Sequence, residues 1–305
     1  MKLNQIRMVL AIADKGSLRA AARDLDMTQP SLTHSLGELE RELGATLFER
    51  NARGMVPTPV GQVFLRRAAV VDSEARRARE EVAQFLGSDH GELFICLSVV
   101  AHLALLPMAL PLFQQRFPGV RLRVLEGAFP AVESRLRDGS MDFYIGAAPD
   151  PAPSSEFVVE KLFDNTRAVF ARQGHPLAQA RSLAELAGAS WITTGITDKA
   201  EAELRELFAQ HRLPPPRLVL QSESMLTMLS TLMATDAMVI ALRQLEEFPL
   251  TRSALQRVPV REDLPAPPVV VVRRAALPLA PAADYFCDMF RRAAVAYQKS
   301  SGSAA

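Results

Sequence analysis

The sequence of 305 residues contains little that would serve catalysis or redox chemistry. It has two cysteines, Cys96 and Cys287, in separate apolar segments, and no cluster of metal ligands surrounds either one. We therefore expect buried free thiols rather than a disulfide, and no metal. Its five histidines are scattered, and the chain lacks a Gly-x-Ser-x-Gly elbow and a phosphate-binding Gly-x-x-x-x-Gly-Lys loop. We expect a protein that is not an enzyme and holds no cofactor.

The sequence also lacks membrane signals and an excess of charge. No apolar run reaches the roughly 18 residues of a membrane span, and the first residues lack the apolar core of a signal peptide. We expect a cytoplasmic protein with no membrane partner. The formal net charge is +1, and residues 1–58 carry eight Lys or Arg against seven Asp or Glu. A nucleic-acid role must therefore rest on pattern and not on charge.

Residues 1–58 have the pattern of a winged helix-turn-helix. Apolar residues from Leu3 to Ala13 recur at helical spacing, and Gly16 ends that helix. Ser17 is placed to cap a second short helix, and Thr28 a third that has Pro30 in its first turn and ends at Gly44. Residues 47–50 and 55–58 then flank a turn, which predicts a short β-hairpin.

The third helix of such a motif enters the major groove, where its first residues meet base edges. Glutamine can read adenine with two hydrogen bonds, and serine or threonine hydroxyls bond bases or phosphates. Basic residues of the wing suit phosphates or the minor groove. Singly, each polar residue fits a solvated helix face equally well, but together they occupy one exposed turn opposite a leucine stripe. The expected DNA-contacting residues are Ser17, Gln29, Pro30, Ser31, Thr33, His34, Arg50 and Arg53.

A long helix is predicted from Pro59 to about Leu86, followed by a hinge-like linker. Apolar residues alternate spacings of four and three, which is the heptad pattern of a coiled coil. We expect a homodimer through this helix. The alternative is an amphipathic helix packed on its own chain. The heptad residues are Phe64, Ala68, Val71, Ala75, Ala78, Val82 and Phe85.

From Glu92 onward, strands and helices alternate, which predicts an α/β fold with a mainly parallel sheet. The expected strands are residues 93–98, 120–125, 143–147, 166–172, 191–193, 217–220, 238–241, 257–260 and 269–273. The expected helices are residues 103–117, 130–137, 183–186, 199–211, 225–235 and 281–297. The tail, residues 298–305, is expected to be disordered.

Ligands of open α/β sheets bind beyond the carboxyl ends of the strands. The helix start after Ser98 would offer backbone N–H groups to an anion, and Phe129 could form an apolar wall. Since no arginine is evident there, we expect a small organic anion, which could be aromatic, held by neutral donors. The alternative is that these polar residues only cap helices. The expected effector-binding residues are Ser98, Val99, Val100, Ala101, His102, Phe129, Ala147, Thr193, Thr194 and Ser224.

An ordered series of motifs resembles the signature of LysR-type transcriptional regulators. It consists of Gly16-Ser17-Leu18-Arg19-Ala20-Ala21-Ala22, Leu25, Gln29-Pro30-Ser31-Leu32-Thr33, Leu39-Glu40, Leu43-Gly44, Leu47-Phe48-Glu49-Arg50 and Thr58-Pro59-Val60-Gly61. The resemblance implies a dimerising linker helix, a two-lobed effector domain like periplasmic binding proteins, and dimers of dimers that bend DNA. Residues 129–132 and 137–143 also resemble the branch that regulates aromatic-sulfonate or aminobenzoyl-glutamate use.

The expected domains are a DNA-binding head (residues 1–58), a linker helix and hinge (59–90), a first effector lobe (91–165 and 266–297), a second lobe (166–265) and the tail. The expected function is sequence-specific transcription regulation, with an operator duplex and a small organic anion as partners, in a homodimer and then a homotetramer. Two alternatives are an architectural DNA-binding protein without an effector and an enzyme fused to a DNA-binding head.

Overall fold

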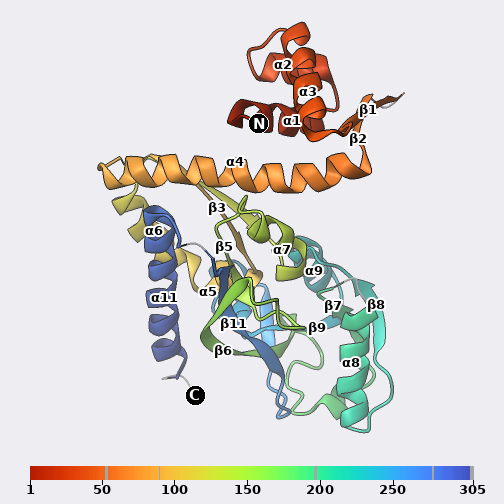
Figure 1. Cartoon of the computed structure of the whole chain (residues 1–305). Coiled ribbons are helices and arrows are strands. Elements are labelled where there is room, and N and C mark those ends of the chain that lie inside the picture. Colours follow the sequence, from red (N-terminus) through yellow and green to blue (C-terminus); the bar gives the residue numbers. More distant parts are fainter. Residues whose placement is uncertain (52–53, 89, 196–197, 277, 303–305) are drawn as a thin grey trace.

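The computed structural model describes residues 1–51, 54–88, 90–195, 198–276 and 278–302. A small head of three helices and a hairpin stands at one end, and one long helix separates it from a larger α/β body (Figure 1). No helix among the described residues is long and apolar enough to cross a membrane.

The head is the predicted winged helix-turn-helix. Its elements are α1 (Leu3–Lys15), α2 (Leu18–Asp24), α3 (Gln29–Leu43), β1 (Phe48–Asn51) and β2 (Gly54–Pro57). The predicted caps are confirmed, because Ser17 and Thr28 accept backbone N–H groups at the starts of α2 and α3, and Gly16 and Gly44 end α1 and α3 in left-handed conformations. Residues such as Val9, Ile12, Leu32 and Leu39 are fully buried in the core between the helices.

The long helix α4 (Pro59–Phe85) packs on its own chain along part of its surface. Phe64 and Ala68, which we predicted in the dimer seam, pack instead on the core of the head. Their neighbours are apolar side chains of α1, so this part of the heptad pattern reflects an intramolecular contact. Val71, Val82 and Phe85 remain 44%, 60% and 89% exposed. The apolar surface left for a partner is therefore shorter than the predicted seam.

The body contains one sheet of nine strands among the described residues, in the order β4-β3-β5-β11-β6-β9-β7-β8, with β10 also paired to β6. The strands are β3 (Gly91–Leu97), β4 (Val120–Glu126), β5 (Phe143–Ala147), β6 (Phe157–Arg172), β7 (Ser190–Thr193), β8 (Arg217–Gln221), β9 (Ala237–Leu242), β10 (Leu255–Val258) and β11 (Pro265–Arg274). Pairing is parallel among β3, β4 and β5 and among β7, β8 and β9. The long strands β6 and β11 are antiparallel to their neighbours and join the two parallel sets. The expectation of a mainly parallel sheet therefore holds within each lobe only.

Each parallel set has its own hydrophobic core, which defines two lobes. The first lobe includes α5 (Val99–Ala104), α6 (Leu106–Arg116), α7 (Phe129–Arg137) and α11 (Pro281–Gly302). The second includes η1 (Leu183–Leu186), α8 (Asp198–Gln210), α9 (Met225–Ala234), η2 (Arg243–Glu246) and α10 (Pro249–Arg252). Phe286 and Phe290 are fully buried in the first lobe, and the ring of Trp191 meets Phe208 edge-on in the second.

Several boundaries differ from the predictions. The helix predicted over residues 103–117 is two helices, α5 and α6, which meet at Leu105, because Pro107 has no backbone N–H to continue the hydrogen-bonding pattern of a single helix. The strand β6 begins nine residues before the predicted position 166, where alternating exposed and half-buried residues obscured it. Helix α11 continues to Gly302, so residues 298–302 are helical and not disordered as predicted. Residues 303–305 lie outside the described part of the chain.

Candidate DNA-binding surface and effector site

The first turn of α3 presents a group of exposed polar side chains. Thr28 caps the helix by accepting the Ser31 N–H at 3.3 Å, so the residues that follow do not have to serve as caps. The hydroxyl of Thr33 donates to the carbonyl of Gln29 at 2.9 Å. Gln29, Pro30, Thr33 and His34 together line a shallow hollow on the surface. The structure therefore brings four of the predicted DNA-contacting residues onto one open surface.

The other predicted DNA-contacting residues have mixed surroundings. Ser31 is exposed, and its hydroxyl lies 2.8 Å from that of Thr28. Ser17 is half-buried and accepts the Ala20 N–H at 3.4 Å, so it serves at least as the cap of α2. Arg50 is exposed on β1, and Arg53 lies outside the described residues.

The wing is docked on the turn between α1 and α2. The N–H of Met55 donates to the carbonyl of Gly16 at 2.8 Å. Gly54, just before it, has φ +107°, and a Cβ built at this position would lie 2.3 Å from the same carbonyl oxygen. Only glycine therefore fits at position 54, and the close approach fixes the wing against the helices.

Helix α5 lies at the boundary between the lobes. It follows strand β3, and its Leu103 packs on the core of the second lobe. The Ser98 Oγ atom is buried and has no hydrogen-bond partner among the described residues. His102 places Nδ1 3.1 Å from the carbonyl of Ser98. Val100 and Ala101 point into the first-lobe core, so only their backbone could face a ligand.

The backbone at the end of β5 is closely packed against Ser98 and Tyr144. A Cβ on Gly146 would lie 2.2 Å from the Tyr144 hydroxyl oxygen and 2.6 Å from Ser98. The Tyr144 hydroxyl donates to the carbonyl of Ala147 at 3.1 Å, and burial raises the pKa of this phenol. Gly146 is thus required at the end of β5, because a side chain there would collide with both hydroxyl-bearing residues.

Phe129 does not form the predicted apolar wall. Its side chain is 4% exposed, and its ring meets Tyr144 and Phe157 edge-on. Phe157 lies in the part of β6 that we did not predict. The sequence therefore did not show that another aromatic ring would pack against Phe129 in the core. Phe129 therefore belongs to the first-lobe core.

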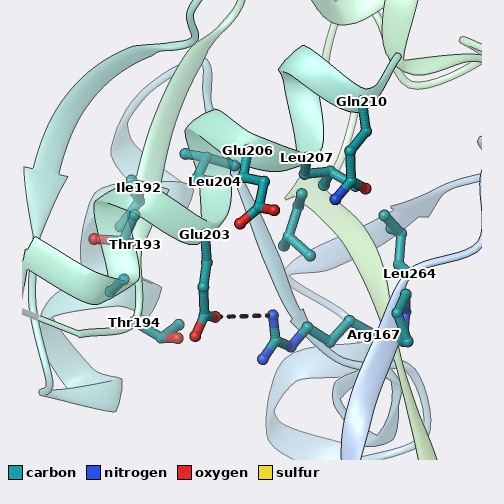
Figure 2. Close-up of a pocket in the computed structure, with 13 residues that line it drawn as sticks. Arg167, Ile192, Thr193, Thr194, Glu203, Leu204, Glu206, Leu207, Gln210 and Leu264 are labelled. Carbon is teal, nitrogen blue, oxygen red and sulfur yellow. Dashed lines mark ion pairs between the residues drawn. The ribbon is translucent and has the colours of Figure 1, made fainter.

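A pocket of about 240 Å³ lies in the second lobe between α8 and the strands β6 and β11 (Figure 2). Predicted residues Thr193 and Thr194 line it, and Thr193 donates its hydroxyl hydrogen to the carbonyl of Gly195 at 2.9 Å. Ser224 is not among the lining residues and caps α9 by accepting the Thr227 N–H at 3.3 Å. The full lining is Arg167, Ile192, Thr193, Thr194, Ala200, Glu203, Leu204, Glu206, Leu207, Gln210, Ile240, Leu264 and Pro265.

Arg167 corrects the expectation that no arginine stands near the effector residues. Its side chain reaches the pocket from β6, while Glu203 and Glu206 point into the pocket from one face of α8 (Figure 2). The guanidinium Nη1 atom lies 3.6 Å from the Glu203 carboxylate, and no hydrogen bond of this guanidinium is found among the described residues. We did not predict Arg167 at the effector site, because we expected ligand-binding residues at the ends of strands and Arg167 lies within β6.

Neither a metal centre nor a reactive thiol is found in the described part of the chain. No three His, Cys, Asp or Glu side chains there are grouped to hold a metal ion. Cys96 and Cys287 are both free and fully buried, and burial raises the pKa of each thiol to about 12.

Family models match nearly the whole chain. Residues 3–62 match the bacterial regulatory helix-turn-helix of the lysR family, and residues 86–295 match the LysR substrate binding domain. This chain belongs to the LysR family. It is a DNA-binding transcriptional regulator with an effector-binding domain, and not an enzyme, as the sequence predicted.

Relatives of this LysR-type regulator are themselves named as regulators. It is 28% identical to the regulator GbpR of Azospirillum brasilense over 286 residues, which are 93% of this chain and 84% of the relative. It is 29% identical to the hca operon activator HcaR of Escherichia coli over 196 residues, 64% of this chain and 65% of the relative.

Solved structures of LysR-family regulators share the fold. The regulator CbnR matches with a TM-score of 0.69 at 20% identity, covering 96% of this chain and 99% of that one. CbnR in complex with its target DNA matches with a TM-score of 0.68. A full-length OxyR variant from Pseudomonas aeruginosa matches with a TM-score of 0.70 at 23% identity, covering 95% of both chains.

Three positions of the LysR-like motif have structural roles that the sequence did not reveal. Glu40 accepts the N–H groups of Leu47 at 2.6 Å and Phe48 at 3.4 Å, which fixes the start of the wing. Thr58 caps α4 by accepting the Gly61 N–H at 2.9 Å. A Cβ on Gly61 would lie 2.0 Å from the Leu47 carbonyl oxygen. These motif residues hold the wing and α4 in fixed positions relative to α3.

Proposed function

We propose that this LysR-type regulator reads its operator through the first turn of α3, assisted by Arg50 and Arg53 of the wing. The observation that carries the proposal is the exposed surface of Gln29, Pro30, Thr33 and His34 beyond a helix start that Thr28 already caps. Ser31, next to Thr28, and Ser17, at the start of α2, would bind the DNA backbone or neighbouring bases.

The substitution Gln29→Ala tests this assignment. The Gln29 side chain makes no hydrogen bond in the described part of the chain, so its loss should leave the fold intact. We expect a loss of about 5- to 150-fold in affinity for the duplex that the full chain selects from a random pool, because one bidentate base contact contributes roughly 1–3 kcal/mol. A scrambled duplex should lose little, and the exposed Gln114→Ala on α6 is the control. An equal loss on both duplexes, or none, contradicts base reading by Gln29.

The exposed apolar face of α4 supports assembly. Val71, Val82 and Phe85 are apolar, and a large part of each side chain remains exposed. We propose that this face pairs with α4 of a second copy, and that two such dimers form a homotetramer. Two heads per dimer also compensate for the near-neutral charge of a single head, because each copy adds its own base contacts.

A regulator that binds the chromosome acts where the chromosome lies, so we propose a cytoplasmic location.

We also propose that the effector is a small organic acid with a single anionic group, bound where the second lobe meets β6 and β11. Arg167 would pair with the acid group, and Thr193 and Thr194 would add hydroxyl contacts. Glu203 and Glu206 in the same pocket disfavour a second negative charge on the ligand. Leu204, Leu207 and Leu264 provide an apolar surface for its body. From the first lobe, residues 98–102 and Ala147 would approach the ligand as the lobes close.

Thermal unfolding of the full chain with benzoate, 4-aminobenzoate and the dianion phthalate tests the pocket. A ligand at 100 times its Kd stabilises the native state by about 2.7 kcal/mol. We expect stabilisation by a monoanion, little effect of phthalate, and loss of the effect in Arg167→Met. Arg205→Met is the matched control, since Arg205 lies on α8 but pairs with Glu201 outside the pocket lining. A shift that survives Arg167→Met, or one produced by phthalate alone, contradicts this site.

The architectural alternative lacks this support. A protein without an effector would be expected to fill the space beside Thr193 and Thr194 with its own side chains, and an open pocket of about 240 Å³ lies there instead. We therefore favour regulation by a ligand. We propose the same division of the chain into a DNA-binding head (residues 1–58), a linker helix and hinge (59–90), a first lobe (91–165 and 266–297) and a second lobe (166–265). The second lobe would be the part that moves when the ligand binds.

A further inference from the structure

The lining of the second-lobe pocket carries more negative than positive charge. Its charged side chains are one arginine, Arg167, and two glutamates, Glu203 and Glu206, so the net charge of the lining is −1. Glu203 lies 3.6 Å from the Arg167 guanidinium and offsets its charge, whereas Glu206 has no ion pair or hydrogen bond of its side chain among the described residues. A simple anion that enters this pocket therefore meets a surplus carboxylate.

The packing of α8 directs this surplus carboxylate into the pocket. Leu204 and Phe208, one turn apart, are buried in the second-lobe core, which fixes the rotation of the helix about its axis. Glu203 and Glu206 are three positions apart, so they lie on one face of α8 and are displaced by about 4.5 Å along its axis. Both side chains point into the pocket (Figure 2). The Glu206 carboxylate is thus about one turn beyond the ion pair that Glu203 makes.

The strands beside α8 contribute one site for a carboxylate and one for a hydrogen-bond donor. The Arg167 N–H donates to the Leu264 carbonyl at 2.8 Å, which holds β6 against the segment that precedes β11. The guanidinium is 34% exposed, so it can still donate to a ligand. The buried Thr193 hydroxyl already donates its hydrogen to the Gly195 carbonyl at 2.9 Å. Its oxygen can therefore only accept, which suits an ammonium group and not a carboxylate.

We propose that the effector is an amino acid with an apolar side chain, which this pocket binds more tightly than the corresponding simple acid. The carboxylate of the ligand pairs with Arg167, and its ammonium group meets Glu206 and the Thr193 hydroxyl oxygen. The apolar side chain packs on Leu207 and Leu264. The volume of about 240 Å³ is below the roughly 300–1,000 Å³ of pockets for drug-sized ligands, which suits so small a molecule.

The net charge of the ligand decides between the two classes. A zwitterion adds no net charge to a lining that is already negative, whereas a simple acid makes the occupied pocket more negative still. This inference rests on the proposed function, which places an acid group at Arg167 but assigns no partner to Glu206.

Three probes with the same phenyl group test this ligand class in thermal unfolding of the full chain. L-phenylalanine carries both charged groups, 3-phenylpropanoate lacks the ammonium group, and 2-phenylethylamine lacks the carboxylate. Each is titrated to roughly 10 mM, at which even a Kd of about 1 mM stabilises the native chain measurably. We expect phenylalanine to bind about two- to fivefold more tightly than either truncated probe, because each exposed ion pair contributes modestly.

Substitutions of Glu206 test its role directly, and because the side chain is exposed they should leave the fold intact. Glu206→Gln should bring the Kd of phenylalanine close to that of 3-phenylpropanoate, and Glu206→Lys should reverse their order. Glu201→Gln is the matched control, because it removes the same charge from α8 outside the pocket lining and should leave the ratio unchanged. If 3-phenylpropanoate binds the unaltered chain as tightly as phenylalanine does, or if Glu206→Gln does not change their ratio, the inference is wrong.

The variant Arg167→Met separates this inference from the proposed function. It should weaken the binding of the two probes that carry a carboxylate and leave that of 2-phenylethylamine nearly unchanged. If 3-phenylpropanoate binds in a way that depends on Arg167 but an added ammonium group gains nothing, the proposed site stands and the amino-acid ligand is refuted. If none of the three probes stabilises the chain, or if Arg167→Met affects none of them, both the site and the inference fail.

Discussion

The substitution Gly54→Ala should release the wing while leaving the three helices of the head folded. Gly54 combines φ +107° with a carbonyl of Gly16 that lies 2.3 Å from the position of an added Cβ. Because the obstacle is backbone, no side-chain rotation can relieve the contact. The hairpin must move away from the turn between α1 and α2, and the Met55 N–H to Gly16 hydrogen bond is lost with it.

The magnitude follows from two contributions. A left-handed backbone costs an alanine about 1–2 kcal/mol. Loss of the hydrogen bond, with a carbonyl left unsatisfied, costs about 1–2 kcal/mol more. We expect the wing to be destabilised by about 2–4 kcal/mol in total, which corresponds to a 30- to 900-fold decrease in protection from hydrogen exchange.

Hydrogen exchange of the full chain measures this by segment, since local opening is reported separately from global unfolding. Two other glycines provide matched controls. Gly44→Ala meets the same left-handed penalty at φ +66° but has nothing within 4 Å of the added Cβ. Gly37→Ala lies inside α3 in open space and should stabilise the helix by about 0.5–1 kcal/mol.

The reasoning predicts an order in which Gly54→Ala is the most harmful, Gly44→Ala is intermediate and Gly37→Ala is favourable. Protection should fall in residues 48–51 and 54–57 and remain in α1. DNA affinity should fall with it, because Arg50 stands on the displaced hairpin. If Gly54→Ala exchanges no faster than Gly44→Ala, the close approach to Gly16 does not hold the wing, and the assignment is wrong.

Three further outcomes are expected. Val71→Glu, which places a charge on the exposed face of α4, should dissociate the assembly in sedimentation, and an unchanged molecular mass would contradict the proposed pairing. Cys96 and Cys287 should not react with a thiol reagent at pH 8 until the chain is unfolded, since burial keeps both thiols protonated; fast labelling of the native chain would refute this. Arg291 holds the pKa of Glu160 below its usual range through two hydrogen bonds of 2.8 Å. The ionised Glu160 therefore stabilises the folded chain above the unfolded pKa of about 4.3, and this stabilisation is lost as the pH falls through the folded pKa. Unfolding of Arg291→Gln compared with the unaltered chain should differ most at neutral pH and converge in acid, and a difference that grows in acid would contradict that sign.

The head could be predicted because its signals are local. Ser17 and Thr28 cap helices within three residues of their own position, and Gly16 and Gly44 end helices where they stand. Such contacts depend on neighbours in sequence, so a reading of spacing and residue type finds them. The order of strands and helices in the body could also be predicted. The first half of β6 was missed, because exposed and half-buried residues alternate along it and several of them are charged.

The candidate effector site was only partly predictable. Thr193 and Thr194 were identified from their place after a strand, and they do line the pocket. Arg167 was missed, because nothing in the sequence shows that β6 passes beneath α8. Phe129 was misassigned, because the partner that buries its ring, Phe157, is 28 positions further along the chain.

The sequence by itself determined that this protein has a helix-turn-helix head, a long linking helix and an α/β effector domain, and that the first turn of α3 is its exposed polar end. Hydrophobic period, caps and turn residues carry that information within a few positions. Only the tertiary structure decided which face of α4 is free and which is covered by the head and the first lobe. It alone placed Arg167 beside Glu203, and Arg77 beside Asp142. Such pairs form between residues far apart in the chain, and the physical reason is that strand order and helix packing, which spacing does not encode, decide which distant side chains meet.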